Sequence, residues 1–501
     1  MKNFFILLTM LFIAGCASSN QTAVLHVSFN NIKDPHCWVR VADEISPSSG
    51  EISIKPGKIA ERSFKLPRPC FVNLNCYDSG NSAKFFSYTL YLSPGDDLDL
   101  KADFNKPGFG ITVTGKGSNN NQPLMGLTKQ WWNLSDFNKD TLPDRIINTL
   151  NAEQRAYESN LKNYIERYKP SNDYVRACKI DLPYIITYNY YTFKENNKNQ
   201  IWDAYKRNYA KWQRVSDSLF TTSKISNDEA LNSIHYTELI NDFLPRERER
   251  LLNMAQDEPK AFYKEWYNAD TLNGKKLLMD DNRNLLQEKI ISKYFTGKSA
   301  EYAYAVLLKD ASREADPQNI PQIFERFKNK YPHSNYIALF GPSVDTISAR
   351  FKQVLNNKMI FWADNGAKLN TLQDVITAMK GKTVLVDMWG TWCGPCREEI
   401  EKHSTSVRNH FKDKSLNYLY IANYDLQNSE QWKKLIVYFD MEGIHITANK
   451  KLTNDIMAKV KGQGFPTMFI IKKNGTVEPA KSQYPINEDV LINQLEEVLT
   501  E

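Results

Sequence analysis

The chain has 501 residues, which is too long for one ordinary hydrophobic core and therefore predicts several domains. Its hydrophobic content of 42% and charged content of 24% are those of a soluble globular protein, which excludes a largely disordered or membrane-embedded chain. The formal net charge of +6 is small for this length, and no long basic stripe is present, so we expect no nucleic-acid partner.

The N-terminus predicts an export signal. A lysine near the start precedes an apolar run over residues 4–13, which is too short to span a bilayer permanently. The run ends in small residues that lead into Cys16, and this pattern resembles the lipobox of bacterial lipoproteins. We therefore expect residues 1–15 to be a lipoprotein signal peptide and Cys16 to be lipidated. The alternative is an ordinary cleaved signal peptide in which Cys16 has no role.

Four further cysteines lie outside the motif discussed below: Cys37, Cys70, Cys76 and Cys178. Cys70 and Cys76 fall on one predicted strand, where they would stand roughly 20 Å apart at about 3.3 Å per residue. That separation is beyond the reach of a disulfide. Either residue could pair with Cys37 from a neighbouring strand, since an oxidising compartment permits such bonds. The alternative is that these side chains are buried thiols.

Residues 24–120 are predicted to form a small antiparallel β-sandwich. Apolar and polar residues alternate in short segments separated by turn residues such as Ser93-Pro94-Gly95-Asp96. The predicted strands are 24–29, 51–54, 87–92 and 97–100. Regular turns and a β-rich composition are typical of a sandwich, and no residue of this region is assigned a catalytic role.

Residues 121–356 are predicted to form an α-helical region. Apolar residues recur three and four positions apart among lysines and glutamates. The clearest helical segments are 152–168, 200–219, 247–255 and 321–330. Aromatic residues are dense here, and we interpret them as packing between helices rather than as a glycan- or peptide-binding surface.

Residues 358–501 alternate between strand and helix patterns, which predicts an α/β sandwich around a mixed sheet. The predicted strands are 383–388, 416–422 and 467–471. The predicted helices are 393–411, 429–438, 454–461 and 488–499. The dipeptide Asn474-Gly475 predicts a tight hairpin turn.

The motif Cys393-Gly394-Pro395-Cys396 lies between the first of these strands and the helix that follows it. One helical turn brings both sulfurs within bonding range, and the helix N-terminus stabilises a thiolate at Cys393. A Cys-x-x-Cys pair can be half of a zinc site, but no second pair completes it, so we expect no metal. The chain has no nucleotide-binding glycine fingerprint, so we expect no cofactor beyond the redox-active disulfide.

With Asp387 and Trp392 before the motif and Gly464-Phe465-Pro466 after it, this region resembles the thioredoxin fold, specifically its TlpA-like extracytoplasmic branch. The resemblance implies that Cys393, on an exposed first helical turn, attacks a partner's disulfide. Cys396 then breaks the mixed disulfide. A buried Asp387 with a raised pKa would accept the proton of Cys396.

The same resemblance implies supporting roles around the two sulfurs. Gly394 and Pro395 give a tight entry to the helix. Trp392 forms an apolar lip, the backbone of Phe465 pairs with a client peptide, and Pro466 is a cis-proline. The family's helix commonly carries a proline where this chain has Glu401, so we expect a straighter helix.

These expectations predict a lipid-anchored thiol–disulfide oxidoreductase that faces the periplasm and reduces the disulfides of client proteins. Its reducing power would come from a membrane-embedded thiol donor. The segment 91–96 with Thr114-Gly115-Lys116-Gly117 resembles the β-rich domain of unknown role that often precedes a thioredoxin module in such lipoproteins. The alternative is a binding or scaffold lipoprotein whose thioredoxin module serves docking.

Overall fold

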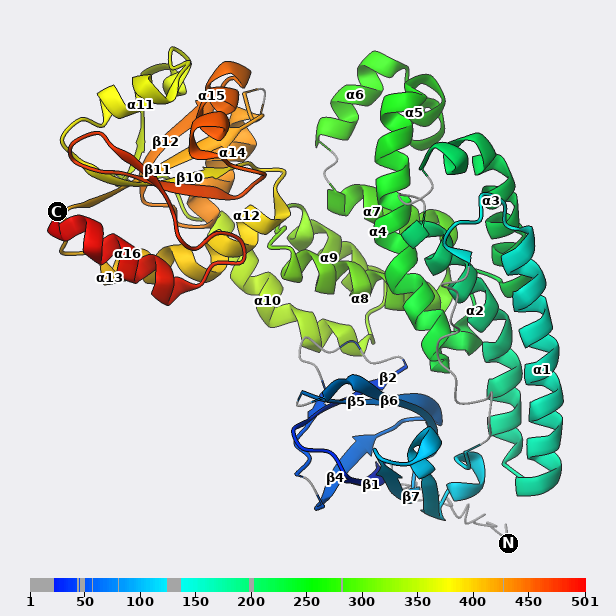
Figure 1. The fold of residues 1–501 in the computed structure, drawn as a ribbon. Helices are drawn as coiled ribbons and strands as arrows, with labels where there is room; N and C mark the ends of the chain where they lie inside the picture. The colour runs from blue at the N-terminus through cyan, green and yellow to red at the C-terminus, as the bar shows by residue number, and fades with distance from the viewer. Residues whose placement is uncertain are drawn as a thin grey trace, which may run out of the picture. The chain divides into compact units, whose positions relative to one another are not determined.

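The computed structural model describes residues 22–501, except 43–44, 46–49, 56, 80, 124–136, 198–201, 281–282 and 427. The predicted signal peptide and Cys16 lie outside the described residues. The chain divides into two compact units, Met1–Arg250 with Ile291–Ala303 and Leu251–Ile290 with Tyr304–Glu501 (Figure 1).

The first unit contains two four-stranded sheets, of order β4-β1-β7-β8 and β3-β2-β5-β6. Their strands are β1 Thr22–Asn30, β2 Pro35–Val41, β3 Gly50–Ile52, β4 Ile59–Lys65, β5 Cys70–Asp78, β6 Asn81–Leu92, β7 Asp97–Asp103 and β8 Thr112–Lys116. Apolar side chains of both sheets, such as Leu25 and Leu74, form one buried core between them. This layering is that of a β-sandwich.

The prediction that the strands are antiparallel is correct for one of the two sheets. In the other sheet it is wrong for one pair of strands. All pairs of β3-β2-β5-β6 are antiparallel, whereas β1 runs parallel to β7, with Val24 opposite Asp97. Alternation of apolar residues reports which face a side chain occupies but not the direction of the neighbouring strand.

A disulfide joins Cys37 of β2 to Cys76 of β5, which are directly opposite each other in the strand register. Both side chains are buried. Cys70 and Cys178 remain thiols and are also buried. Of the alternatives left open by the sequence, the structure therefore contains one cross-strand bond and two buried thiols.

The middle of the chain is helical, as predicted. Its helices are α1 Asp144–Tyr168, α2 Asn172–Asn197, α3 Trp202–Ser223, α4 Ile234–Asp257, α5 Pro259–Tyr267, α6 Thr271–Asp280, α7 Arg283–Tyr294, α8 Gly297–Arg313, α9 Ile320–Lys330 and α10 Asn335–Phe351. Aromatic side chains pack inside this region, for example Tyr190, which stacks on the buried Trp212.

The C-terminal part of the second unit is built on a six-stranded sheet of order β14-β13-β10-β11-β12-β9. Its strands are β9 Met359–Phe361, β10 Thr383–Trp389, β11 Leu416–Asn423, β12 Gly443–Ala448, β13 Thr467–Ile471 and β14 Val477–Pro479. The central strand β10 runs parallel to β11 and antiparallel to β13, which confirms the predicted mixed sheet.

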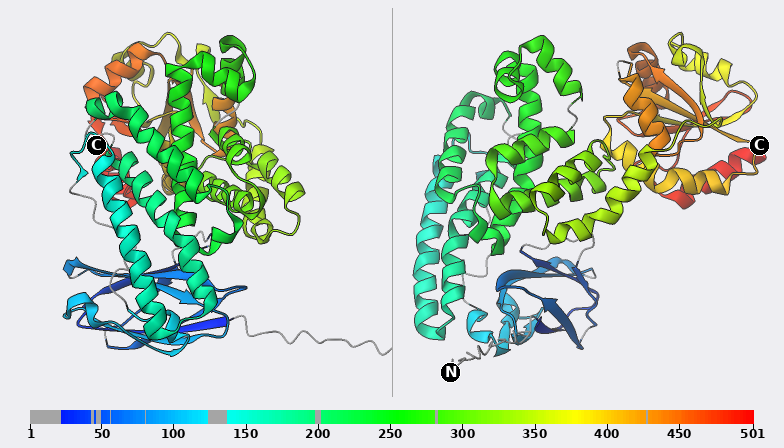
Figure 2. Two further views of the ribbon diagram at one scale, coloured as in Figure 1. Left: turned by 90° about the vertical axis from the view of Figure 1, so that its right-hand side faces the viewer. Right: turned by 180° about the vertical axis from the view of Figure 1, so that it is seen from behind.

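Helices cover both faces of this sheet (Figures 1 and 2). Helices α11 Leu372–Ala378 and α15 Lys450–Val460 pack on one face, whereas α13 Thr405–His410 and α16 Glu488–Thr500 pack on the other. The side chains of β10 alternate between these two cores, with Val386 in the first and Leu385 in the second. The remaining helices are α12 Gly394–Glu399 and α14 Ser429–Tyr438.

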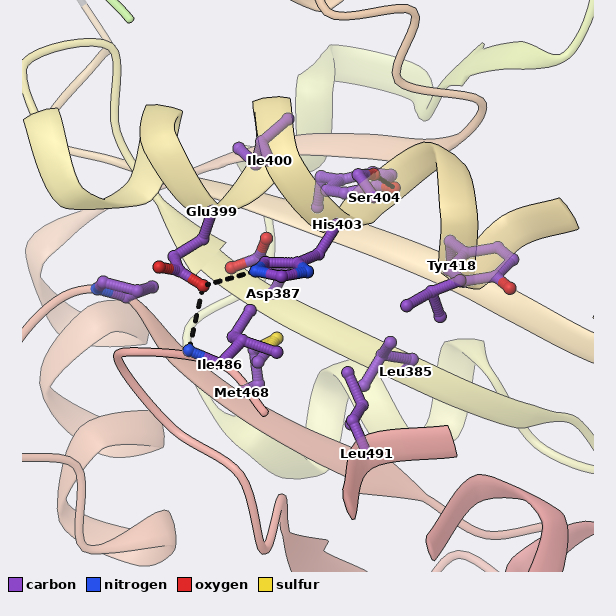
Figure 3. A pocket seen from close by; sticks show the side chains of 13 residues that line it. Leu385, Asp387, Glu399, Ile400, His403, Ser404, Tyr418, Met468, Ile486 and Leu491 are labelled. Carbon is purple, nitrogen blue, oxygen red and sulfur yellow. Dashed lines mark hydrogen bonds and ion pairs between the residues drawn. The ribbon is translucent and has the colours of Figure 1, made fainter. Parts of the chain in front are cut away.

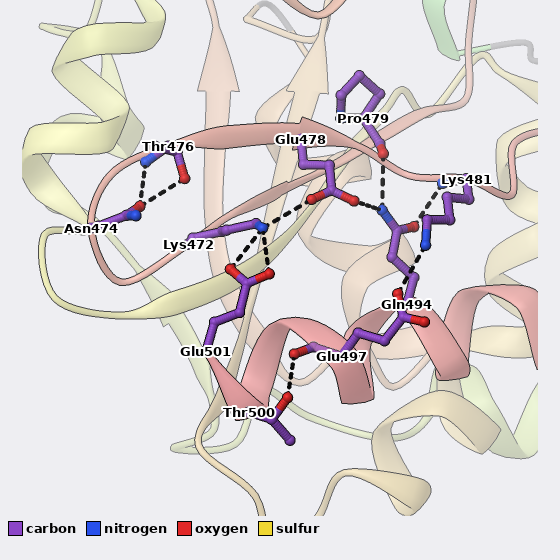
Figure 4. A network of polar contacts seen from close by, with 10 residues as sticks. All are labelled: Lys472, Asn474, Thr476, Glu478, Pro479, Lys481, Gln494, Glu497, Thr500 and Glu501. Carbon is purple, nitrogen blue, oxygen red and sulfur yellow. Dashed lines mark hydrogen bonds and ion pairs between the residues drawn. The ribbon is translucent and has the colours of Figure 1, made fainter.

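Polar contacts fix the closing helix α16 to the edge strand β14 (Figure 4). The Lys472 ammonium lies 3.1 Å from Glu478 and 2.8 Å from Glu501. The Gln494 amide donates to the carbonyl of Pro479 at 3.1 Å. These contacts hold the C-terminal helix in place beneath the sheet.

The described residues contain no helix with the length and apolar character needed to cross a membrane.

Candidate active site

Strand β10 ends at Trp389, and a short loop carries the chain to Cys393 at the start of α12. Cys393 is disulfide-bonded to Cys396, with a Cα–Cα distance of 5.3 Å. Its sulfur also caps the helix by accepting the backbone N–H of Cys396 at 3.2 Å. Gly394 and Pro395 occupy the first helical turn, where the missing N–H of proline leaves no bond unmade. The backbone therefore directs a donor at the sulfur that the sequence predicts to be the nucleophile.

The expected exposure of Cys393 is wrong. Only 3% of Cys393 and 1% of Cys396 is accessible to solvent in this disulfide form. The sequence places Cys393 at a helix start, but it does not show which distant segments pack around that turn.

Arg397, the residue after the motif, links the site to the connection between α8 and α9. Its guanidinium donates to the carbonyls of Thr391 at 2.6 Å and Ala315 at 3.0 Å. It also forms an ion pair with Asp316 at 3.3 Å, and both side chains are buried. Burial lowers the pKa of Arg397. No local sequence pattern identifies this residue, because Ala315 and Asp316 lie about eighty positions away along the chain.

A second buried anchor holds the other side of the same loop. Asp425 accepts the backbone N–H of Thr391 at 2.8 Å and its hydroxyl at 2.6 Å. Burial raises the pKa of Asp425, whereas the two hydrogen bonds from Thr391 oppose that shift. Thr391 is thus fixed by Asp425 on one side and by Arg397 on the other, which positions the residues directly before Cys393.

Three aromatic rings lie together at the rim of the site. Trp392 is 47% exposed, and its ring lies 5.6 Å from that of Phe465 and 6.1 Å from that of Tyr424. The indole N–H of Trp392 donates to the carbonyl of Asn423 at 2.9 Å. The structure therefore brings the predicted Trp392 and Phe465 together and adds Tyr424, which the sequence analysis did not single out.

Tyr424 has a left-handed backbone conformation, with φ of +62°. Its neighbours Asn423 and Asp425 are almost completely buried, whereas Tyr424 is 58% exposed. A non-glycine residue with this conformation is uncommon and is typically found where the surrounding structure holds it. The two buried neighbours provide that support, so the loop presents the Tyr424 ring beside Trp392.

The peptide bond between Phe465 and Pro466 is cis, as expected from the resemblance. Pro466 directly precedes β13, which pairs with β10, and it lines the same small cavity as Asp387.

Asp387 lies on β10 and borders a cavity of about 40 Å³ (Figure 3). Its Oδ1 atom is buried and has no hydrogen-bond partner within the described part of the chain. Burial and, to a smaller extent, the charge of Glu399 raise the pKa of Asp387 to about 7. A carboxyl group with this pKa exchanges its proton near neutral pH, which suits a general acid–base.

An acidic and an imidazole side chain, Glu399 and His403, also border the cavity. Glu399 is 5% exposed and accepts the backbone N–H of Ile486 at 3.0 Å. His403 lies 3.7 Å from Glu399 and 2.9 Å from Glu488 of α16. His403 thus faces the cavity, together with Glu399 (Figure 3).

The helix after the motif is not one continuous α-helix. Residues Ile400–Ser404 form a π-helical turn, which includes Glu401 at the position of the family's proline. The absence of proline therefore does not give the regular, straighter helix that we expected. Single π turns within α-helices are frequent at functional sites, and here the turn carries His403 to the cavity.

The described residues contain no group of three His, Cys, Asp or Glu side chains that could hold a metal ion.

Comparisons with known proteins agree with this geometry. Residues 381–477 match the family model described as thioredoxin-like. The sporulation thiol-disulfide oxidoreductase A of Bacillus subtilis (strain 168) is 27% identical over 117 residues, which cover 22% of this chain and 64% of the relative. The thioredoxin-like protein YneN of the same organism is 27% identical over 116 residues, covering 22% of this chain and 59% of the relative.

Among solved structures, the thioredoxin domain of a thiol-disulfide oxidoreductase from Bacteroides vulgatus is 26% identical, with a TM-score of 0.21, covering 25% of this chain and 83% of that chain. The chain spans less than two thirds of the length of the curated relatives it matches. The C-terminal domain is thus thioredoxin-like, is related to thiol–disulfide oxidoreductases and carries their pair of cysteines.

Proposed function

We propose that this protein is a lipid-anchored thiol–disulfide oxidoreductase of the cell envelope that reduces disulfides of client proteins. The observation that carries the proposal is the Cys393–Cys396 disulfide at a helix start, on the strand–helix unit that also holds Asp387. The fold of a scaffold protein needs neither a bonded pair of cysteines at this position nor an ionisable carboxyl in a cavity beneath it.

The reaction begins with the dithiol form of the protein. The Cys393 thiolate attacks one sulfur of the client disulfide, whose S–S bond breaks, and the other client sulfur leaves with the electron pair. Cys396 gives its proton to Asp387 and attacks the Cys393 sulfur, which releases the second client sulfur. Two electrons thereby pass to the client, and a membrane-embedded thiol donor must reduce the new Cys393–Cys396 bond.

The rim of the site fits a client peptide. Trp392 and Tyr424 offer exposed aromatic surface, and the partly buried Phe465 packs against both rings. The backbone at Phe465 and Pro466 is the proposed partner of an extended client segment. The Gly394-Pro395 pair resembles that of thioredoxin, a reductant with a potential near about −270 mV, so we assign the same direction here.

An oxidising location is supported by two features. The N-terminal pattern up to Cys16 is that of a lipoprotein signal. The Cys37–Cys76 disulfide is of a kind that forms and persists mainly outside the cytoplasm. We therefore place the protein at a membrane of the cell envelope, facing the periplasm.

Reduction of insulin by the full chain, with dithiothreitol as the electron source, tests this function. We expect catalytic turnover that Cys393→Ser abolishes, because serine cannot form the mixed disulfide. The matched control is Cys178→Ala, which should retain activity, since burial raises the pKa of Cys178 to about 12 and keeps it from forming a thiolate. If the wild-type chain is folded but gives no turnover, the proposed enzymatic function is wrong and the scaffold role is favoured.

A further inference from the structure

We propose that His403 carries protons between solvent and the cavity that contains Asp387, by way of Glu399 on the inner side, while the Glu488 carboxylate orients the imidazole ring on the outer side. This inference rests on the proposed function, because Asp387 must change its protonation state whenever the Cys393–Cys396 bond forms or breaks.

The surroundings of Asp387 are mainly apolar, and although the residue is only partly buried, its Oδ1 atom is inaccessible to solvent. Leu385, Ile400 and Met468 line the cavity around it. A cavity of about 40 Å³ is large enough to hold a water molecule, which can pass a proton over a short distance. The way from the cavity to solvent then requires side chains that bind and release protons.

The cavity offers few such side chains. Tyr418 and Tyr420 also line it, but burial raises the pKa of both hydroxyl groups, so they keep their protons near neutral pH. Glu399 and His403 are the remaining ionisable residues of the lining besides Asp387. Figure 3 shows both side chains directed toward Asp387 from the helix above it.

Two ion-pair distances lead from Glu399 toward the surface. Glu399 Oε2 lies 3.7 Å from His403 Nε2, and His403 Nδ1 lies 2.9 Å from Glu488 Oε2. Side-chain exposure increases along this series, from 6% at Glu399 to 23% at His403 and 28% at Glu488. An imidazole ring can accept a proton at one nitrogen and release it from the other, which is the property a relay requires.

The charged groups that face His403 are Glu399 on its own helix and Glu488 on α16. The neighbouring Lys402 is directed to Glu398 instead, at 3.8 Å. Hydrogen bonds from His403 and then from Ser406 lower the pKa of Glu488, so this carboxylate stays ionised and holds the ring in place. Protons therefore pass from His403 to solvent rather than remaining on Glu488.

The path acts in both half-reactions. When a thiolate donor attacks Cys393, the Cys393–Cys396 bond breaks and Cys396 leaves with the electron pair and needs a proton. Below pH about 7 that proton is already present on Asp387, whereas above it the proton must enter from solvent. Loss of the path should therefore slow the reduction of the disulfide only at alkaline pH.

The test measures the rate at which dithiothreitol reduces the Cys393–Cys396 bond of the full chain, as the ratio of variant to wild type over a range of pH. For His403→Gln we expect a ratio near one below pH 7 and a loss on the order of 10²-fold above it. Added imidazole should restore the rate. Glu488→Gln should show a defect in the same pH range.

His410→Gln is the matched control, because His410 also pairs with a glutamate of α16, at 2.7 Å from Glu496, but does not line the cavity. Its ratio should stay near one throughout. A flat ratio for His403→Gln, or a loss that is uniform in pH and not restored by imidazole, would overturn the inference. Failure of the proposed function is distinct, since the wild-type chain itself would then reduce no insulin.

Discussion

Replacement of Arg397 by methionine is expected to lower the free energy of unfolding of the unit that contains it by about 3–5 kcal/mol. Methionine keeps much of the side-chain volume but leaves Asp316 as an unpaired buried charge. One oxygen of Asp316 already has no hydrogen-bond partner in the described structure, so nothing replaces the lost guanidinium. Denaturant unfolding of the full chain, followed by tryptophan fluorescence, measures this change.

Arg350→Met provides the matched control for this prediction. Arg350 pairs with Glu401 at 2.6 Å, but both side chains are 35% exposed, so we expect a change of about 1 kcal/mol or less. Removing the second charge as well, in an Arg397→Met, Asp316→Leu double variant, should recover part of the lost stability. Equal small effects of Arg397→Met and Arg350→Met would show that the buried pair does not stabilise the site.

Replacement of Asp387 by asparagine is expected to raise the free energy of unfolding at neutral and alkaline pH by up to about 4 kcal/mol. Burial raises the pKa of Asp387 from 3.8 to about 7, and each pKa unit corresponds to about 1.4 kcal/mol. A carboxyl with a raised pKa binds its proton more tightly in the folded protein. The wild type therefore loses stability as pH rises from the unfolded pKa to the folded pKa, whereas the variant does not.

The measurement is the difference in free energy of unfolding between Asp387→Asn and wild type at several pH values. The difference should be small near pH 4, should grow as the pH approaches 7 and should then stay constant. Asp374→Asn is a control for which we expect a decrease in the free energy of unfolding at neutral pH, because backbone hydrogen bonds from Asn370 and Thr371 lower the pKa of Asp374. A difference for Asp387→Asn that does not vary with pH would contradict the raised pKa.

The parts of the fold that the sequence predicted are those with local signals. The buried strand before the motif and the turn at Asn474-Gly475 each depend on residues close in sequence, and both are present. The helix after the motif is also present, but with a π-helical turn within it. Strand β12, with its sequence Gly-Ile-His-Ile-Thr-Ala, was missed. Its central His445 is completely buried, although a histidine in a short segment usually indicates a surface position.

The site was predictable where it follows a family motif and not where it depends on tertiary contacts. The cysteine pair and Pro466 were found from their motifs. Arg397 contacts Ala315, and His403 contacts Glu488, across more than eighty residues of the chain. No pattern in a single sequence reports such pairings. The burial of Cys393, which is 3% exposed, was also mispredicted.

The backbone conformation at Tyr424 affects how the proposed client peptides would bind. Asn423 and Asp425 are anchored by hydrogen bonds on either side of Tyr424, and Trp392 donates a hydrogen bond to the same loop. Contacts within the chain itself therefore position the rings of Trp392 and Tyr424. A client peptide that binds against these rings would lose conformational entropy, but the protein side chains would need little ordering. This favours higher affinity for a given contact area.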